Sequence, residues 1–172
     1  MKRRYQERAH LLFTDTDSLM YHIETQPGED VYQDMIDNAE WFDLSNYEAT
    51  NSYYMPEFQR NKAKVGLMKD EAAGYPISEF VGLRPKMYSY LVVKEKPDGT
   101  VEYIDKHRAK GIQRVVAAKF THDEYKAQLN TPEENFVVNR RLGSHLHRIN
   151  AIEVWSGACR AFFPRIHYIV CF

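Results

Sequence analysis

Two aspartates one residue apart, Asp15 and Asp17, are the residues of this chain whose type and spacing most directly suggest chemistry. They stand in the stretch 11–23, which reads Leu-Leu-Phe-Thr-Asp-Thr-Asp-Ser-Leu-Met-Tyr-His-Ile. Two close carboxylates repel each other, and a divalent cation is the usual remedy in proteins. Carboxylate oxygens at a strand end suit Mg²⁺ or Mn²⁺. The pair therefore predicts a site for a divalent metal ion.

The residues on either side of the aspartate pair predict a β-hairpin. After the pair, apolar residues occupy alternate positions at Leu19, Tyr21 and Ile23, which is the period of a half-buried strand. Thr16 and Ser18 stand between the two apolar runs, and such side chains satisfy local backbone groups in tight turns. We therefore expect both carboxylates at the tip of a hairpin whose turn is held by Thr16 and Ser18.

Several chemistries use the pattern Asp-x-Asp. A calcium-binding EF-hand loop requires Asp or Asn, Gly and Glu at its positions 5, 6 and 12. Counted from Asp15, these positions hold Leu19, Met20 and Gln26, so the EF-hand is excluded. A metal-dependent phosphatase with an aspartyl nucleophile stays open as an alternative, although no strand and helix alternation follows the pair. A sugar-transfer site and a plain turn capped by two aspartates stay open as well.

The rest of the chain predicts an α+β fold with an antiparallel sheet and a flanking helix. We expect the end of a helix over residues 1–8 and a helix capped by Asp30 that runs to about residue 42. A long loop over 45–62 and a short strand over 65–71 should follow. An antiparallel meander is expected over 77–108, since Asp98-Gly99 is a strong hairpin signal.

The C-terminal third predicts a small helical part. Thr121 and Glu124 form a capping-box pattern, and Thr131-Pro132-Glu133-Glu134 repeats a helix-start signal. The apolar stretch 161–172 either pairs into a sheet or belongs to a longer element.

Composition and charge narrow the function classes. The chain has 172 residues, 44% of them hydrophobic, and no apolar run approaches the ~20 residues of a membrane helix. Only two cysteines occur, so we expect an intracellular protein without a disulfide framework and without membrane association. Residues 9–59 contain no Lys or Arg and 11 Asp or Glu, whereas residues 60–126 contain 14 Lys or Arg and 9 Asp or Glu. This segregation indicates either two solvated faces or a metal-binding part beside a polyanion-binding part.

Residues 12–19, Leu-Phe-Thr-Asp-Thr-Asp-Ser-Leu, resemble the third palm motif of family B DNA polymerases, whose core is Asp-Thr-Asp-Ser between two strands. Residues 82–88, Gly-Leu-Arg-Pro-Lys-Met-Tyr, are similar to the Lys-x-Tyr motif of the same family. Within the family, the chain resembles most closely the protein-primed branch, which occurs in large eukaryotic DNA transposons (Mavericks or Polintons) and in related viruses. This resemblance lies in the stretches 43–47, 69–74, 79–84 and 109–111. The resemblance covers roughly residues 10–130 and extends loosely to about 170.

The resemblance implies nucleotidyl transfer assisted by two divalent ions, Mg²⁺ or Mn²⁺. It puts the firm metal ligand on Asp17 and a supporting role on Asp15. Lys86 would meet a DNA phosphate, and Tyr88 would hydrogen-bond or pack against the primer strand near its end. Weaker candidates for contact with the DNA backbone are Arg84, Lys69 and Lys110.

The implied organisation is a palm portion over 1–108 and a thumb-like portion over 109–172. The family's other metal-binding Asp and its triphosphate-binding Lys belong to motifs that we do not find in this sequence. We therefore expect a C-terminal fragment that is inactive in isolation. Implied partners are primer-template DNA, deoxynucleoside triphosphates and, where initiation is protein-primed, a terminal protein. A non-catalytic DNA-binding remnant, or a pseudogene product without function, is the alternative.

Overall fold

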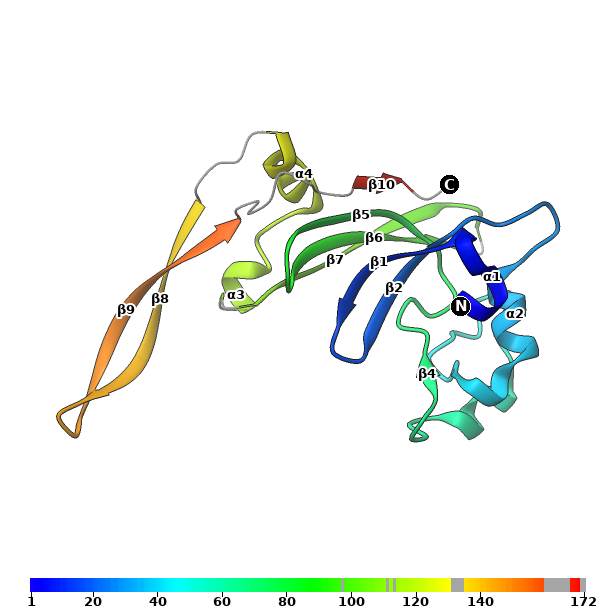
Figure 1. The fold of residues 1–172 in the computed structure, drawn as a ribbon, viewed down its shortest axis with the longest axis horizontal. Helices are drawn as coiled ribbons and strands as arrows, with labels where there is room; N and C mark the ends of the chain where they lie inside the picture. The colour runs from blue at the N-terminus through cyan, green and yellow to red at the C-terminus, as the bar shows by residue number, and fades with distance from the viewer. Residues whose placement is uncertain (97, 111, 113, 131–134, 160–167, 171–172) are drawn as a thin grey trace. The chain divides into compact units, whose positions relative to one another are not determined.

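The computed structural model describes residues 1–96, 98–110, 112, 114–130, 135–159 and 168–170, and the fold is α+β as expected (Figure 1). The chain divides into two units. Unit 1 comprises residues 1–77 and 92–104, and unit 2 comprises residues 78–91 and 105–172. Both units are discontinuous in sequence, so they do not coincide with the predicted division at residue 108. Among the described residues, no helix is long and apolar enough to cross a bilayer.

Unit 1 begins with short elements around one hydrophobic cluster. Helix α1 (Lys2–Tyr5) and the 3-10 turn η1 (Gln6–Arg8) lead into the strands β1 (Ala9–Asp15) and β2 (Ser18–Ile23). Helix α2 (Val31–Asp37) and the 3-10 turns η2 (Ala39–Trp41) and η3 (Pro56–Asn61) follow. The buried residues of the cluster are Met35, Leu44, Tyr47 and Phe58.

The predicted cap of α2 is confirmed. Asp30 Oδ1 accepts the backbone N–H of Tyr32 at 2.9 Å and of Gln33 at 3.3 Å. These bonds satisfy amides that a helix start leaves without intrahelical partners. The helix ends earlier than predicted, because the Asn38 side chain donates to the Asp34 carbonyl at 2.7 Å and the chain turns into η2.

The loop after η3 is organised by Asp70 rather than by a strand over 65–71. Only β4 (Met68–Lys69) pairs there, in parallel with β3 (Phe42–Asp43). The Asp70 carboxylate accepts the N–H of Gly74 at 2.7 Å and the Tyr47 hydroxyl at 2.9 Å. The strand prediction was wrong over most of its length because the apolar residues of this stretch face solvent, with Val65 fully exposed.

The predicted meander is confirmed as the strands β5 (Ile77–Arg84), β6 (Met87–Glu95) and β7 (Val101–Ala109). They lie in the order β10-β5-β6-β7, where β10 (Tyr168–Val170) pairs antiparallel with β5. The predicted β6–β7 turn is supported by Asp98 Oδ1, which accepts the Thr100 amide at 2.9 Å. Of the two readings of the apolar C-terminal stretch, sheet pairing holds for residues 168–170.

Unit 2 packs short helices against the sheet. The helices α3 (Arg114–Ala117) and α4 (His122–Asn130) contribute to a cluster of buried residues that comprises Val81, Leu83, Met87, Ala109, Ala117 and Tyr125. The predicted capping box of α4 is confirmed. The Thr121 amide donates to Glu124 Oε2 at 2.7 Å, and the Glu124 amide donates to the Thr121 hydroxyl at 3.3 Å.

The second predicted helix is wrong from residue 135 onward. Its start signal over 131–134 lies outside the described residues, and β8 (Asn135–His145) and β9 (Arg148–Cys159) form a long antiparallel ribbon (Figure 1). Each strand pairs its backbone with the other across a two-residue turn, so the segment forms a hairpin and not a helix. Positive φ angles at Leu146 (48°) and His147 (60°) form the tight connection of the ribbon.

Gly74 gives a test of the Asp70 loop. Its φ is +77°, and a Cβ would lie 2.8 Å from both the Asn51 amide nitrogen and a Tyr47 ring carbon. Gly74→Ala should lower the free energy of unfolding by roughly 2–4 kcal/mol, through left-handed backbone strain plus overpacking.

Gly28 provides the control, since its φ is +85° but a Cβ would meet nothing within 4 Å. Gly28→Ala should cost about 1–2 kcal/mol from backbone strain alone. Urea denaturation measures both values. Equal losses in the two variants would contradict the tight packing at Gly74.

Candidate functional site

The Asp-Thr-Asp-Ser sequence forms the tip of the β1–β2 hairpin. Strand β1 pairs antiparallel with β2, and Asp15 is the partner of Ser18 at the last rung. Thr16 and Asp17 are the two residues of the turn. Asp15 is half-buried, whereas Asp17 is exposed. The hairpin places one carboxylate at a strand end and the other in the turn, so the two belong to one local site.

The turn is strained at Thr16. Its φ is +61°, a conformation that is unusual for a β-branched residue. A positive φ at the first turn position alone is typical of a type II′ turn, where glycine is preferred. The Thr16 hydroxyl donates to Asp15 Oδ1 at 3.2 Å. Thr16 thus connects the backbone of the turn to the carboxylate of Asp15, which glycine could not do.

Arg8 closes the base of the hairpin. Its guanidinium donates to the Glu24 carbonyl at 2.8 Å and to Glu29 Oε1 at 2.9 Å, and it forms a further ion pair with Glu29 Oε2. The Glu24 amide donates to the Arg8 carbonyl at 2.9 Å. The hydrogen bonds from Arg8, and from the Gln26 amide, lower the pKa of Glu29 from 4.5 to about 2. We call this set of contacts between Arg8, Glu24 and Glu29 the Arg8–Glu29 bracket. It ties both ends of the hairpin to the segment that follows it.

Lys69, a predicted DNA contact, lies in unit 1 beside a buried carboxylate. It is the parallel-strand partner of Asp43, which is 4% exposed. Burial alone would raise the pKa of Asp43, but hydrogen bonds from Ser45 and Ala63 and the charge of Lys69 bring it below its ordinary value. Lys69 therefore stabilises unit 1 electrostatically, which is a structural role that the sequence did not indicate.

The other predicted DNA contacts gather in unit 2 at the β5–β6 turn. Pro85 and Lys86 connect the strands, and Lys86 has a φ of +62°. Pro at the first turn position with a positive φ at the second is the arrangement of a type II turn. The Lys110 amide donates to the Lys86 carbonyl at 3.0 Å, and Arg84 Nε reaches Met87 Sδ at 3.4 Å. The structure thus brings Arg84, Lys86 and Lys110 together.

Tyr88 belongs to a row of aromatic rings on β5 and β6. Its ring centroid lies 6.3 Å from that of Tyr90, with an interplanar angle of 22°, and 6.1 Å from that of Phe80. Tyr88 is half-buried. The rings of Phe80 and Tyr90 therefore hold the orientation of the Tyr88 ring. Any ligand that contacts Tyr88 would pack against a ring whose position is already set.

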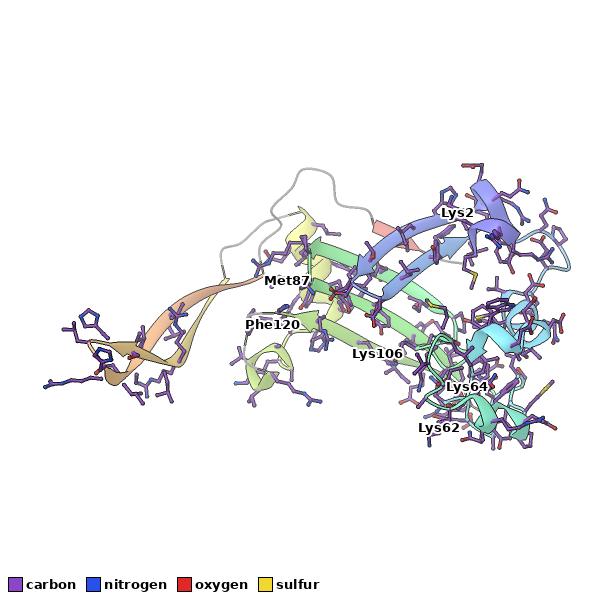
Figure 2. All side chains as sticks on the ribbon, turned by 60° about the horizontal axis from the view of Figure 1, so that its bottom comes forward. Lys2, Lys62, Lys64, Met87, Lys106 and Phe120 are labelled. Carbon is purple, nitrogen blue, oxygen red and sulfur yellow. The ribbon has the colours of Figure 1, made fainter. Side chains whose placement is uncertain are left out.

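The β8–β9 ribbon carries basic residues that the sequence analysis missed. Two cross-strand pairs, Arg141–Ile152 and His145–Arg148, lie on the same face of the ribbon. They are four residues apart along β8, and every second pair of an antiparallel ribbon points to the same side. All four are exposed or partly exposed, and the side chains project from both faces of the ribbon (Figure 2). The adjacent pair Arg140–Glu153, at 3.0 Å, lies on the opposite face.

A second missed group begins at the end of η3 and continues into the loop before β4. It comprises Arg60, Lys62 and Lys64, which are all exposed, and Figure 2 labels Lys62 and Lys64. Their alternate spacing in the sequence was a usable signal. The ribbon had no such signal. Residues 131–134 suggested a helix, and in a helix Arg141 and Arg148, seven residues apart, would also lie on one face, so their spacing did not distinguish a helix from a ribbon.

Within the described part of the chain, no group of three or more His, Cys, Asp or Glu residues is arranged to hold a metal ion. Asp15 and Asp17 are two oxygen donors of the kind that Mg²⁺ prefers, so they fit as part of a coordination shell. No protein-family model, curated protein or solved structure matches the chain.

The pKa of Glu29 predicts how the bracket responds to acid. A carboxylate whose folded pKa lies below its unfolded value stabilises the fold at pH values above the unfolded pKa, and this contribution disappears as pH falls through the folded pKa. The Arg8–Glu29 contribution should therefore be complete above pH 4.5 and be lost toward about pH 2.

Glu29→Gln should lower the thermal midpoint at pH 7, and the gap to wild type should close on acidification to pH 2. Glu57→Gln, at an exposed position in η3, is the matched control and should have little effect. Parallel pH profiles of Glu29→Gln and wild type would contradict the bracket.

Proposed function

We propose that the chain is part of a family B DNA polymerase of the protein-primed type, carrying its palm and thumb-like portions. In the intact enzyme, deoxynucleotides would be added to a 3′-hydroxyl on primer-template DNA, or to a protein hydroxyl at initiation. The observation that carries the proposal is the position of Asp15 and Asp17 at the tip of an antiparallel hairpin. A phosphatase of the Asp-x-Asp type needs its pair at the carboxyl end of a central parallel strand, so this position weighs against that alternative.

Asp17 and Asp15 would hold Mg²⁺ or Mn²⁺ in this function. A bound divalent ion supplies positive charge against the charge that develops on the transferring phosphoryl group. Asp17 is the more exposed of the two and is suited to direct coordination. Asp15 accepts the Thr16 hydroxyl, so it is suited to orient the turn and to add charge. Thr16 acts through its conformation, because its positive φ sets the direction of Asp17.

The cationic residues of unit 2 support a DNA-binding role. Lys86, with Lys110 bonded to its carbonyl, presents positive charge at a turn that is fixed by Pro85. Arg141 and Arg148 add charge on one face of a ribbon, and a two-stranded ribbon fits the major groove of B-DNA. These contacts would neutralise phosphates irrespective of sequence.

A non-catalytic DNA-binding role is the second candidate, because the basic ribbon face makes no use of Asp17. The two functions differ in their dependence on metal. A remnant needs the cationic residues alone, whereas the polymerase role also needs a functional carboxylate tip.

The metal role of the tip is tested by adding Mn²⁺ to the isotopically labelled chain. Its paramagnetism should broaden the amide signals of residues 14–19 first. Asp17→Asn should abolish this selective broadening, and Asp15→Asn should weaken Mn²⁺ binding roughly 10-fold, as expected for a supporting group.

Asp98→Asn changes an exposed turn carboxylate of another hairpin and should leave the broadening at the tip unchanged. If the tip signals of Asp17→Asn broaden like those of wild type, Asp17 is not a ligand, and the DNA-binding role alone is left.

The DNA role of Lys86 is tested with Lys86→Asn, because Asn tolerates a positive φ and keeps the turn while the charge is removed. Affinity for a primer-template duplex should fall, and the slope of log K against log salt should shrink by about 0.9, the value for one lost phosphate contact. Fluorescence anisotropy over a range of salt concentrations measures both quantities.

Lys96→Asn is the control, since Lys96 already pairs with Glu102 at 3.2 Å. Its slope should match that of wild type. A salt slope that does not change in Lys86→Asn would remove Lys86 from the DNA interface.

A further inference from the structure

A pair of histidines lies across the base of the β1–β2 hairpin, at the end away from Asp15 and Asp17. His10 on β1 and His22 on β2 are direct partners in the antiparallel register. Side chains of direct cross-strand partners point to the same face of a hairpin, with Cβ atoms roughly 4.5–5.5 Å apart. Neither the proposed metal site at the tip nor the proposed DNA contacts use these two residues.

The two imidazole rings have the separation that a shared metal ion requires. Their centroids lie 6.0 Å apart, with an interplanar angle of 49°. A ring nitrogen lies about 2.0–2.1 Å from a bound Zn²⁺, so two rings that share the ion have centroids roughly 5–6 Å apart. The backbone register therefore brings the rings to the distance of a two-histidine site. Rotation of the side chains, without a change of the strands, directs one nitrogen of each ring at a common ion.

Glu24 orients one of the two rings. His10 Nε2 lies 3.2 Å from Glu24 Oε1. Because a carboxylate accepts hydrogen bonds, Nε2 is the nitrogen that carries the proton in the neutral ring, and Nδ1 keeps the lone pair that a metal needs. Metal-binding histidines in proteins ordinarily donate their second nitrogen to a carboxylate, a carbonyl or water, which fixes the ring and raises its basicity. His10 has such a partner before any metal binds.

The charges around the pair favour a cation. Residues 9–59 contain no Lys or Arg. Arg8, which donates to the Glu24 carbonyl at 2.8 Å, already forms an ion pair with Glu29. The Glu24 carboxylate adds negative charge beside His10. Among these neighbours, a bound divalent ion therefore meets no uncompensated positive charge.

The donor atoms decide which ion fits. Imidazole nitrogens suit Zn²⁺, Cu²⁺ and Ni²⁺, whereas Mg²⁺ takes oxygen ligands. The His10 and Glu24 side chains are 51% and 61% exposed, so water can complete the coordination shell. Two protein ligands distinguish this arrangement from a closed structural zinc site, which has four. It also agrees with the finding that the described residues contain no group of three or more such ligands.

We propose that His10 and His22 form a binding site for Zn²⁺, with Glu24 as a positioning residue. The ion bridges β1 and β2 at the base of the hairpin, beside the Arg8–Glu29 bracket. Because the two rings meet only when the strands are paired, the ion binds the folded hairpin and stabilises it by mass action. The hairpin thus carries nitrogen donors at its base and carboxylates at its tip. This site is independent of the proposed polymerase function.

Titration of the isotopically labelled full chain with Zn²⁺ tests the site. Zn²⁺ should shift the amide signals of residues 9–11 and 21–24 and the ring signals of both histidines, and it should raise the thermal midpoint as its concentration rises. Mg²⁺ at the same concentration should leave the ring signals unchanged, since it takes oxygen ligands. A hairpin spectrum that does not respond to Zn²⁺ would overturn the proposal without the need for any variant.

Variants assign the ligands. His10→Asn and His22→Asn should each weaken Zn²⁺ binding at the hairpin by roughly 10-fold or more, because each leaves a single imidazole. Glu24→Ala should weaken binding about 10-fold while Zn²⁺ still shifts both rings at saturation, as expected for a positioning residue. His145→Asn, at an exposed position of the β8–β9 ribbon, is the control and should leave the hairpin affinity unchanged. Wild-type affinity in either His10→Asn or His22→Asn would overturn the two-histidine site.

Discussion

Negative charge in a stretch without basic residues is the constraint that shapes unit 1. Residues 9–59 hold 11 carboxylates and no Lys or Arg, so these carboxylates are satisfied by backbone amides or by Lys and Arg residues outside the stretch. Backbone amides serve Asp30 and part of Asp43, and distant cations serve Asp34 through Arg4 and Glu29 through Arg8. Lys94 pairs with Glu48 at 2.6 Å. These bonds stabilise the fold of unit 1 and leave Asp17 exposed at the hairpin tip.

Both motif turns place a non-glycine residue in the left-handed region. Thr16 lies in the tip that carries the carboxylates, and Lys86 lies in the turn that carries the candidate phosphate contact. Strain of this kind persists only where the surroundings impose it. Here, Thr16 bonds to Asp15, and Lys110 bonds to the Lys86 carbonyl. Strained turns fix the directions of the two side chains, Asp17 and Lys86, on which the proposed function depends.

In unit 2, two polar residues, Ser89 and His122, are buried among apolar residues, and the exposed Asp105 contacts them from the surface. Ser89, His122 and Asp105 satisfy one another across α4, β6 and β7, whereas Val81, Leu83 and Tyr125 supply the hydrophobic packing beside them. A polar network in a core specifies one arrangement of elements more sharply than apolar packing does, since every donor must meet its acceptor. The orientation of α4 on the meander follows from that requirement.

Predictions from local signals agreed with the structure where neighbouring residues decide the outcome. The Asp30 cap, the capping box at Thr121 and the turns at the hairpin tip and at Asp98 are set by contacts within a few residues. Predictions of length failed at two places. Helix α2 ends where the Asn38 side chain bonds back to the Asp34 carbonyl, a local contact that the apolar spacing did not indicate. The stretch 65–71 forms little strand, because Val65 is fully exposed and Asp70 is held by the distant Tyr47 hydroxyl.

The sequence by itself determined the chemistry of the candidate site: two carboxylates at a hairpin tip, and a Lys-x-Tyr pair at a later turn. Tertiary structure alone decided what holds these groups. The Arg8–Glu29 bracket, the partnership of Lys69 with Asp43 and the contact of Ser89 with His122 all join residues far apart in the chain. The physical reason is range: caps and turns depend on neighbours in sequence, whereas burial, ion pairing and proton sharing depend on neighbours in space.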